Sequence, residues 1–200
     1  MNVLIEVSAR HVHLTKEDFH LLFGEDKELT FKKALSQPGQ FLSNERVEIT
    51  GPKGKIGNVA ILGPYRNKTQ IEVTLTDCRA LGVEAPVRES GKLDNSAPVS
   101  IAGPLGTIHK DEGLIAAKRH IHMHTSDALQ FGFQDGQIVS VEVPGRRPVC
   151  LHDTVIRAGD QYALAMHIDI DEANAAGFPA NNEDVFGTVI AGNNEQGIMN

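Results

Sequence analysis

The sequence predicts a mainly β protein with short helices (a β/α+β fold class), built as two tandem small β-barrel domains from an internal duplication. Three observations support this prediction. Short runs of β-branched and aliphatic residues recur along the 200-residue chain, glycine and proline separate them, and two stretches resemble each other. Many short strands with few helices are typical of barrels.

The internal repeat is the most informative feature of the sequence. Residues 10–14 read Arg-His-Val-His-Leu, and residues 119–123 read Arg-His-Ile-His-Met. A weaker match near the end of each half pairs Glu72 with His167. Each half therefore carries one His-x-His motif near its start and one further candidate ligand near its end, as expected of a duplicated domain.

The boundary between the repeats is expected in the middle of the chain. Proline and glycine are frequent between Leu81 and Lys118, which is typical of connecting structure. We therefore expect a first β-barrel repeat at residues 1–90, a connecting segment at residues 91–117 and a second β-barrel repeat at residues 118–200. The connecting segment also contains short apolar runs that could form a strand. The active site is expected between the two barrels.

The individual elements follow from local patterns. Strands are predicted in the first repeat at residues 3–7, 47–50, 59–62 and 70–75, and in the second at residues 138–143, 148–151, 153–156 and 163–168. A helix is expected to begin at Thr15, a capping residue with Asp18 three positions later, and another at residues 171–176. The greater length of the first repeat lies in an insertion at about residues 25–44.

Composition excludes several classes of protein. The chain has no apolar run long enough to span a bilayer, so no membrane partner is expected. A formal charge of −7 argues against nucleic acid as a partner, because such binding needs a basic surface. Two cysteines and no secretory signal predict a cytoplasmic protein whose thiols are reduced packing residues. The oligomeric state stays open, with a homo-oligomer among the alternatives.

Charge is unevenly distributed along the chain. Between residues 46 and 68 the only acidic residue is Glu48, whereas the basic residues are Arg46, Lys53, Lys55, Arg66 and Lys68. A basic patch on an acidic protein suits a phosphate-bearing small molecule, with a solvated surface as the alternative. Arg66 is a candidate clamp for an oxyanion, because guanidinium binds phosphate through two parallel hydrogen bonds; a surface ion pair is the alternative.

The two His-x-His motifs are candidate metal ligands. Side chains two positions apart on a strand leave the same face, so His11 and His13 can point at one metal ion, as can His120 and His122. Neutral imidazole is a good ligand for zinc and related divalent ions. One such motif arises by chance or in a core, but its recurrence inside a repeat favours metal ligation.

Glu72 and His167 are the candidate third ligands, because both are polar residues flanked by apolar ones at matching places of the repeats. The alternative is a half-exposed strand whose polar face meets water. Asp169, two residues beyond His167, is a candidate supporting partner or spare ligand. Two sets of three ligands suit two metal ions or one ion with a divided shell. The histidines without a counterpart, expected at the surface or in loops, are His20, His109, His124 and His152.

Six short motifs follow one another along the chain. They are Ser8-Ala-Arg-His-Val-His-Leu, Gly51-Pro-Lys-Gly-Lys, Ile61-Leu-Gly-Pro-Tyr-Arg66, Gln70-Ile-Glu72-Val, Lys118-Arg-His-Ile-His-Met and Met166-His-Ile-Asp. In this order they resemble the phosphate propanoyltransferases of the propanediol-utilisation type. The likeness extends from about Val3 to about Gly192.

The resemblance implies a phosphate acyltransferase that moves a short acyl group, propanoyl or acetyl, between coenzyme A and inorganic phosphate. It also implies two β-barrels and two zinc ions per chain. By motif position, one zinc ion would be held by His11, His13 and Glu72, and the other by His120, His122 and His167. Arg66 matches the family's phosphate-binding arginine, and the positions that match coenzyme A contacts are Val7, Ser8, Ala9, Lys53 and Asn174.

Two departures from the family pattern affect what is expected. Ala60 stands where some members carry a further arginine, so coenzyme A affinity or acyl preference is expected to differ. The first motif begins at Ser8, without the N-terminal extension that directs some members to a microcompartment, so a free cytoplasmic enzyme is expected. The alternatives are a dimetal hydrolase of a thioester or phosphate compound and a non-catalytic metal-binding protein.

Overall fold

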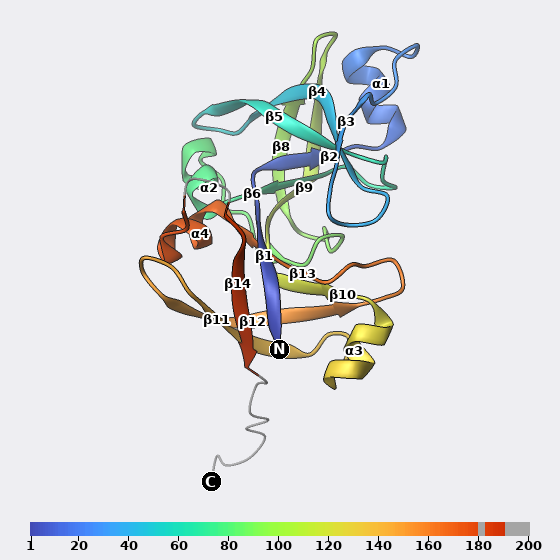
Figure 1. Ribbon diagram of the computed structural model, residues 1–200. Coiled ribbons are helices and arrows are strands. Elements are labelled where there is room, and N and C mark those ends of the chain that lie inside the picture. Colours follow the sequence, from blue (N-terminus) through green and yellow to red (C-terminus); the bar gives the residue numbers. More distant parts are fainter. Residues whose placement is uncertain (180–182, 191–200) are drawn as a thin grey trace. The chain divides into compact units, whose positions relative to one another are not determined.

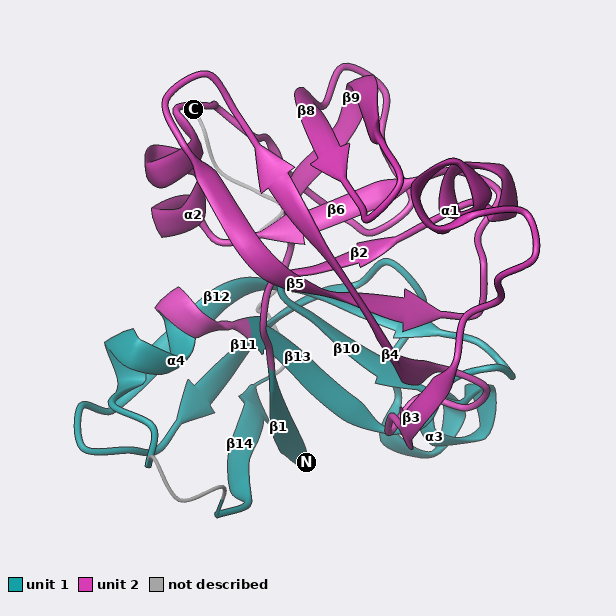
Figure 2. Cartoon of the chain, turned by 90° about the horizontal axis from the view of Figure 1, so that it is seen from above, with its two compact units in different colours: residues 1–7, 119–168, 172–200 teal, residues 8–118, 169–171 magenta. Residues whose placement is uncertain are grey.

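The computed structural model describes residues 1–179 and 183–190 (Figure 1). The last ten positions of the expected second repeat, and with them the end of the family resemblance near residue 192, lie outside the described residues. The described chain divides into two compact units (Figure 2). Unit 1 contains residues 1–7, 119–168 and the chain from 172 onward, and unit 2 contains residues 8–118 and 169–171.

Unit 1 is built on a closed barrel. Its strands are β1 (Asn2–Ser8), β10 (His120–Met123), β11 (Ile138–Val143), β12 (Val149–Ala158), β13 (Ala165–Asp169) and β14 (Val185–Ile190). They pair in the order β1-β13-β10-β12-β11-β14. Two short helices, α3 (Thr125–Phe131) and α4 (Ile170–Ala176), follow strands β10 and β13.

Unit 2 contains an eight-stranded sheet. Its elements are β2 (His11–His13), α1 (Lys16–Phe23), β3 (Phe31–Ala34), β4 (Phe41–Thr50), β5 (Lys55–Gly63), β6 (Gln70–Val73), α2 (Leu75–Leu81), β7 (Val87–Arg88), β8 (Ala97–Ala102) and β9 (Thr107–Ala117). Pairing runs β4-β5-β2-β6-β9, and β8 pairs with both β9 and β4, so six strands form a ring. Strands β3 and β7 are attached to this ring at β4 and β9.

The two rings share one pairing scheme. The His-x-His strands β2 and β10 each pair in parallel with one neighbour, β5 or β12, and antiparallel with the other, β6 or β13. Strand β4 is antiparallel to its neighbours β5 and β8, and β11 is antiparallel to its neighbours β12 and β14. Strand β4 therefore corresponds to β11, and β8 corresponds to β14. A mainly β protein of two small β-barrels is therefore confirmed.

One strand of each ring comes from the other repeat. By pairing, β9 in unit 2 corresponds to β1 in unit 1, and each directly precedes a His-x-His strand. Strand β1, which precedes the first motif, thus belongs to the barrel that contains the second motif. Strand β9, which precedes the second motif, belongs to the barrel that contains the first. The expected segmentation at residues 90 and 118 keeps β1 with the first repeat, whereas the compact units group it with residues 119–168. The segment at 91–117 supplies β8 and β9.

Each unit has its own apolar core. In unit 2 the core includes Val12 and Phe19, and in unit 1 it includes Ile121 and Met166, all fully buried. Val12 and Ile121 are the middle residues of the two His-x-His motifs. Because successive side chains of a strand point to opposite faces, burying these residues in the cores directs the flanking histidines to the other face.

The helices begin where capping chemistry predicts. Thr15 accepts a hydrogen bond from the Asp18 backbone N–H at 3.1 Å, so the predicted start of α1 is confirmed. The predicted helix at 171–176 corresponds to α4. Helix α2 starts after Thr74, which forms a capping box with Asp77, so the strand predicted at 70–75 ends at Val73. No helix in the described part of the chain is long and apolar enough to cross a membrane.

Two further sequence expectations need correction. The strands predicted at 148–151 and 153–156 form one strand, β12, because Asp153 has a φ of 54° and makes an irregularity in the pairing with β11 rather than a break. The packing role expected for both thiols holds for Cys78, which lies in the unit 2 core, where burial raises its pKa. Cys150 is exposed, so packing does not explain it.

Candidate metal centres

The six predicted ligands gather into two groups of three. His11, His13 and Glu72 come together in unit 2, and His120, His122 and His167 come together in unit 1. Within each group the ligand atoms lie within 4.8 Å of one another. These are the groups of this kind in the part of the chain that the structure describes. That they bind metal stays a prediction.

Strand pairing explains why each group forms. In unit 2, His11 is opposite Glu72 and His13 is opposite Gln70 across β2 and β6. In unit 1, His120 is opposite His167 across β10 and β13 in the same antiparallel arrangement. Residues directly opposite each other on neighbouring strands have their side chains about 5 Å apart, so the third ligand is placed beside the first by the sheet itself.

The unit 2 group has atoms suited to a divalent ion. The His11 Nδ1 atom is 2.8 Å from the Ala9 carbonyl oxygen, which can only accept, so Nδ1–H is the donor and Nε2 is the ring nitrogen that a metal ion could bind. His11 Nε2 lies 3.4 Å from Glu72 Oε2. His13 Nδ1 is buried without a hydrogen-bond partner. A buried nitrogen of this kind is costly unless another group, such as a metal ion, binds it.

The protonation states of this group also fit metal binding. Burial, together with the neighbouring His11 and Arg66, lowers the pKa of His13 well below its ordinary value, so its imidazole is neutral. Burial alone would raise the pKa of Glu72, but the electrostatic effect of the adjoining His11, a hydrogen bond from Ser90 and the positive charge of Arg66 lower it to about 2. Neutral imidazole and ionised carboxylate are the forms that bind metal ions.

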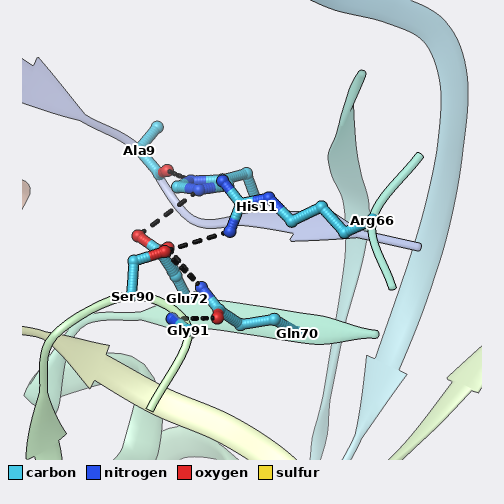
Figure 3. Close-up of polar contacts among 7 residues, drawn as sticks. All are labelled: Ala9, His11, Arg66, Gln70, Glu72, Ser90 and Gly91. Atoms are coloured by element: carbon cyan, nitrogen blue, oxygen red, sulfur yellow. Dashed lines mark hydrogen bonds and ion pairs between the residues drawn. The ribbon is translucent and has the colours of Figure 1, made fainter. Parts of the chain in front are cut away.

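A polar network surrounds Glu72 (Figure 3). Gln70 Nε2 donates to Glu72 Oε1 at 2.5 Å and to Ser90 Oγ at 2.8 Å. Gln70 Oε1 accepts from the Gly91 backbone N–H at 2.7 Å, and Arg66 Nη1 donates to Ser90 Oγ at 3.0 Å. Sequence reasoning missed Ser90, which has no signal in the repeat because it lies in a connecting loop. Gln70 did have a sequence signal, because it lies two residues before Glu72 and therefore on the same strand face.

Arg66 lies next to the unit 2 group. Its backbone N–H donates to the carbonyl of Leu14, directly after His13, at 2.9 Å. Its charge acts on both His13 and Glu72, because it lowers the pKa of each. The structure thus brings this predicted residue to the predicted ligands, and its contact with phosphate stays a prediction.

The unit 1 group has different neighbours. The His122 ring stacks on Tyr162 with centroids 4.1 Å apart, and Arg157 Nη2 donates to the Tyr162 hydroxyl at 3.1 Å. His167 Nδ1 lies 3.6 Å from Glu6 Oε2. Sequence reasoning missed Glu6, Arg157 and Tyr162. An available signal was Arg157, a charged residue between the apolar Ile156 and Ala158.

An arginine precedes each motif and pairs with the helix that follows the third ligand. Arg10 binds the Asp77 carboxylate through two nitrogens, at 2.9 and 2.8 Å. Arg119 Nε lies 3.0 Å from Glu172 Oε1. The register that matches Glu72 with His167 also matches Asp77 with Glu172, but the sequence does not show that these carboxylates pair with the arginines. These contacts tie the start of each His-x-His strand to the end of the strand that carries the third ligand.

The residues predicted to contact coenzyme A are divided between the units. Val7 and Asn174 belong to unit 1, whereas Ser8, Ala9 and Lys53 belong to unit 2. Among these described residues, Ala9 hydrogen-bonds a candidate ligand, because its carbonyl accepts from His11 Nδ1. The backbone N–H of Lys53 donates to the Leu81 carbonyl at 2.9 Å and fixes the turn between β4 and β5. The role of this set stays a prediction.

The predicted basic patch is partly paired within unit 2. Lys55 contacts Glu48 at 3.2 Å and Lys68 lies 4.0 Å from Asp94, while Arg46 donates to backbone carbonyls. Arg66 is the patch residue that reaches the ligand group.

The remaining histidines and Asp169 lie outside the two ligand groups among the described residues. His109 and His152 are exposed and hydrogen-bond to serines on neighbouring strands. His124 caps α3, and His20 lies on α1 near Glu28. Asp169 is the last residue of β13.

Comparison with known proteins gives consistent matches. A family model described as phosphate propanoyltransferase matches residues 4–179. A phosphate propanoyltransferase of Alkaliphilus metalliredigens is 51% identical over 178 residues, which cover 89% of this chain and 84% of the relative. Proteins of the same name from Clostridioides difficile and Thermotoga maritima are 51% and 50% identical, over 87% of this chain and 83% of each relative.

Proposed function

The chain belongs to the phosphate propanoyltransferase family, a family of acyltransferases, and on this premise we propose that it transfers a propanoyl or acetyl group between coenzyme A and inorganic phosphate at a two-zinc site. The observation that carries this proposal is the pair of equivalent three-ligand groups, one of which has Arg66 beside it. The substrates would be acyl-CoA, inorganic phosphate and acyl phosphate.

The two groups would each hold one zinc ion. Three protein ligands per ion, either three histidines or two histidines and a carboxylate, are the sets found in catalytic zinc sites, which keep a further position open. The buried His13 Nδ1 and the ionised Glu72 support this assignment. When bound, such ions polarise carbonyl oxygens and stabilise charge that develops in the transition state.

In the proposed reaction Arg66 binds inorganic phosphate through parallel hydrogen bonds and orients one oxygen toward the thioester. This oxygen attacks the carbonyl carbon, a C–O bond forms and the C–S bond breaks. The products are acyl phosphate and the coenzyme A thiolate. A thiolate is a stable enough leaving group that full protonation is not required.

The test is thiol release from propanoyl-CoA and acetyl-CoA by purified protein, with and without phosphate, before and after chelation. The proposal expects release that needs both phosphate and metal, and the ratio of the two rates defines the acyl preference. Release without phosphate would make the protein a hydrolase of the thioester. Absence of release from metal-loaded protein would leave a non-catalytic metal-binding protein.

A further inference from the structure

The Ser90 hydroxyl lies between two opposite charges of the candidate site (Figure 3). It accepts one hydrogen bond from Arg66 Nη1 and one from Gln70 Nε2, and it hydrogen-bonds the Glu72 carboxylate. A serine hydroxyl has one O–H donor and two lone pairs. These three partners use all of them, and their arrangement requires the O–H to donate to Glu72.

The side chain of Gln70 is likewise held in place by hydrogen bonds. Its side chain is buried, its oxygen accepts from the Gly91 N–H, and its nitrogen donates to both Glu72 and Ser90. These bonds fix the Glu72 carboxylate by its Oε1 atom, so that Oε2 is directed at His11. Hydrogen-bonded partners behind a ligand are known to set its orientation and its affinity for metal.

From this geometry we infer that Ser90 and Gln70 are positioning residues, with Ser90 acting as a spacer that keeps the Arg66 guanidinium from pairing directly with the Glu72 carboxylate. Arginine and carboxylate form strong two-bond pairs when nothing separates them. Such a pair would occupy the carboxylate that the proposed metal needs and the guanidinium that the proposed phosphate needs. The inference rests on the proposed function and assigns the spacing to one hydroxyl.

The second repeat shows which metal the spacer would affect. Gln70 is opposite His13, whereas the equivalent position opposite His122 is Ala165, which has no polar side chain. The hydrogen bonds of Gln70 and Ser90 among the described residues therefore support the unit 2 group. Its disruption should weaken one of two metal ions per chain and leave the other unchanged.

The decisive variants are Ser90→Ala, Ser90→Thr and Gln70→Ala. The matched control is Ser96→Ala, because Ser96 is another serine of the same connecting region that donates to the Leu93 carbonyl and accepts from the Gly113 N–H. Each protein is prepared with its metal, then measured for phosphate KM and kcat, and separately for zinc retained during titration with a chelator.

We expect Ser90→Ala to raise the phosphate KM about tenfold while kcat changes less than about threefold, and to make one zinc equivalent about 10 to 100 times easier to remove. Ser90→Thr restores the hydroxyl and should return both values toward wild type. Gln70→Ala should lower zinc retention more than it raises the phosphate KM. Ser96→Ala should change neither.

Two results would overturn the inference. One is a Ser90→Ala protein with unchanged phosphate KM and unchanged zinc retention. The other is a Ser90→Thr protein as impaired as Ser90→Ala, which would show that volume rather than the hydroxyl matters. If Ser90→Ala does not fold, an unchanged zinc retention in Gln70→Ala overturns it instead. Failure of the proposed function is separate, because it would appear in the wild-type protein as thiol release that does not need phosphate.

Discussion

The two ligand groups occupy equivalent strand positions but have different surroundings. In unit 2 the third ligand is Glu72, held by Gln70 and Ser90 with Arg66 behind it. In unit 1 the third ligand is His167, and a tyrosine stacks on its neighbour His122. The candidate ligands therefore occupy the same strand positions in both units, whereas the residues around them differ. If both groups bind metal as proposed, we expect the two ions to differ in their roles.

The two candidate ligand groups differ in net charge. With Glu72 ionised, the unit 2 group would offset half the charge of a divalent ion, whereas three neutral imidazoles would offset none. An ion in the unit 1 group would therefore attract electrons from a bound oxygen more strongly. The unit 2 ion, next to Arg66, would share the task of holding phosphate.

The largest effect is expected from removing a third ligand. Glu72→Ala and His167→Ala should each lose one metal equivalent and lower thiol release by more than about 100-fold, the upper end for loss of a residue that only supports a ligand. Elemental analysis and the rate assay measure this. Glu48→Ala and His152→Ala, at a half-buried and an exposed residue outside the groups, are the controls. Variants that keep both metal equivalents would refute the ligand assignment.

Arg66→Ala should lower phosphate-dependent turnover by about 100- to 1000-fold, the range for losing a donor that stabilises transition-state charge. Zinc content should stay at two equivalents, because Arg66 is not a ligand. Arg46→Ala, whose guanidinium binds backbone carbonyls, serves as the control. Retained wild-type turnover would show that Arg66 does not bind the attacking phosphate.

Removing the carboxylate of each arginine–carboxylate pair should lower the free energy of unfolding by different amounts. Asp77→Ala removes both the Arg10 pair and the capping box of α2, and we expect a loss of about 2 kcal/mol of unfolding free energy. Glu172→Ala removes the carboxylate that pairs with Arg119, and we expect it to cost about 1 kcal/mol, the upper range for an ion pair that is partly open to solvent. Urea unfolding measures both. Asp77→Asn, which can still cap, should lie between them, and equal costs for both alanine variants would contradict the comparison.

The smallest effect is expected at Tyr162. Tyr162→Phe removes the hydroxyl that accepts from Arg157 but keeps the ring on His122, so the rate should change less than about threefold. Tyr162→Ala removes the ring as well and should cost about tenfold, because the imidazole is then free to rotate. If both variants behave alike, stacking does not orient His122.

The gathering of the six candidate ligands into two groups could be predicted because it follows from short-range rules. His11 and His13 share a strand face by spacing alone, and the repeat supplied Glu72 and His167 as matched third ligands. Ser90 could not be predicted, since it reaches Gln70 and Arg66 from 20 and 24 residues away through a loop without a repeat partner. Hydrogen bonds between residues so far apart in the sequence depend on tertiary packing.

The fold shows the same limit. The barrels followed from strand patterns, but the exchange of β1 and β9 did not, because both strands precede a His-x-His motif and either barrel can bury them equally well by composition. The Arg10–Asp77 pair spans 67 residues, yet it had a faint signal. The repeat changes Asp77 to Glu172 while keeping an arginine before each motif, as expected of residues that contact each other.

The exchange of β1 has a consequence for how the protein is made. Asn2 through Ile5 pair with residues 185–188, so β1 leaves the ribosome long before its partner β14 is synthesised. The chain up to residue 188 must be synthesised before the unit 1 barrel can close, and pairings so distant in sequence form slowly. Until then the edge of β1 that pairs with β14 lacks its partner. Halving the gene in the connecting segment would leave each product without one strand of its own barrel.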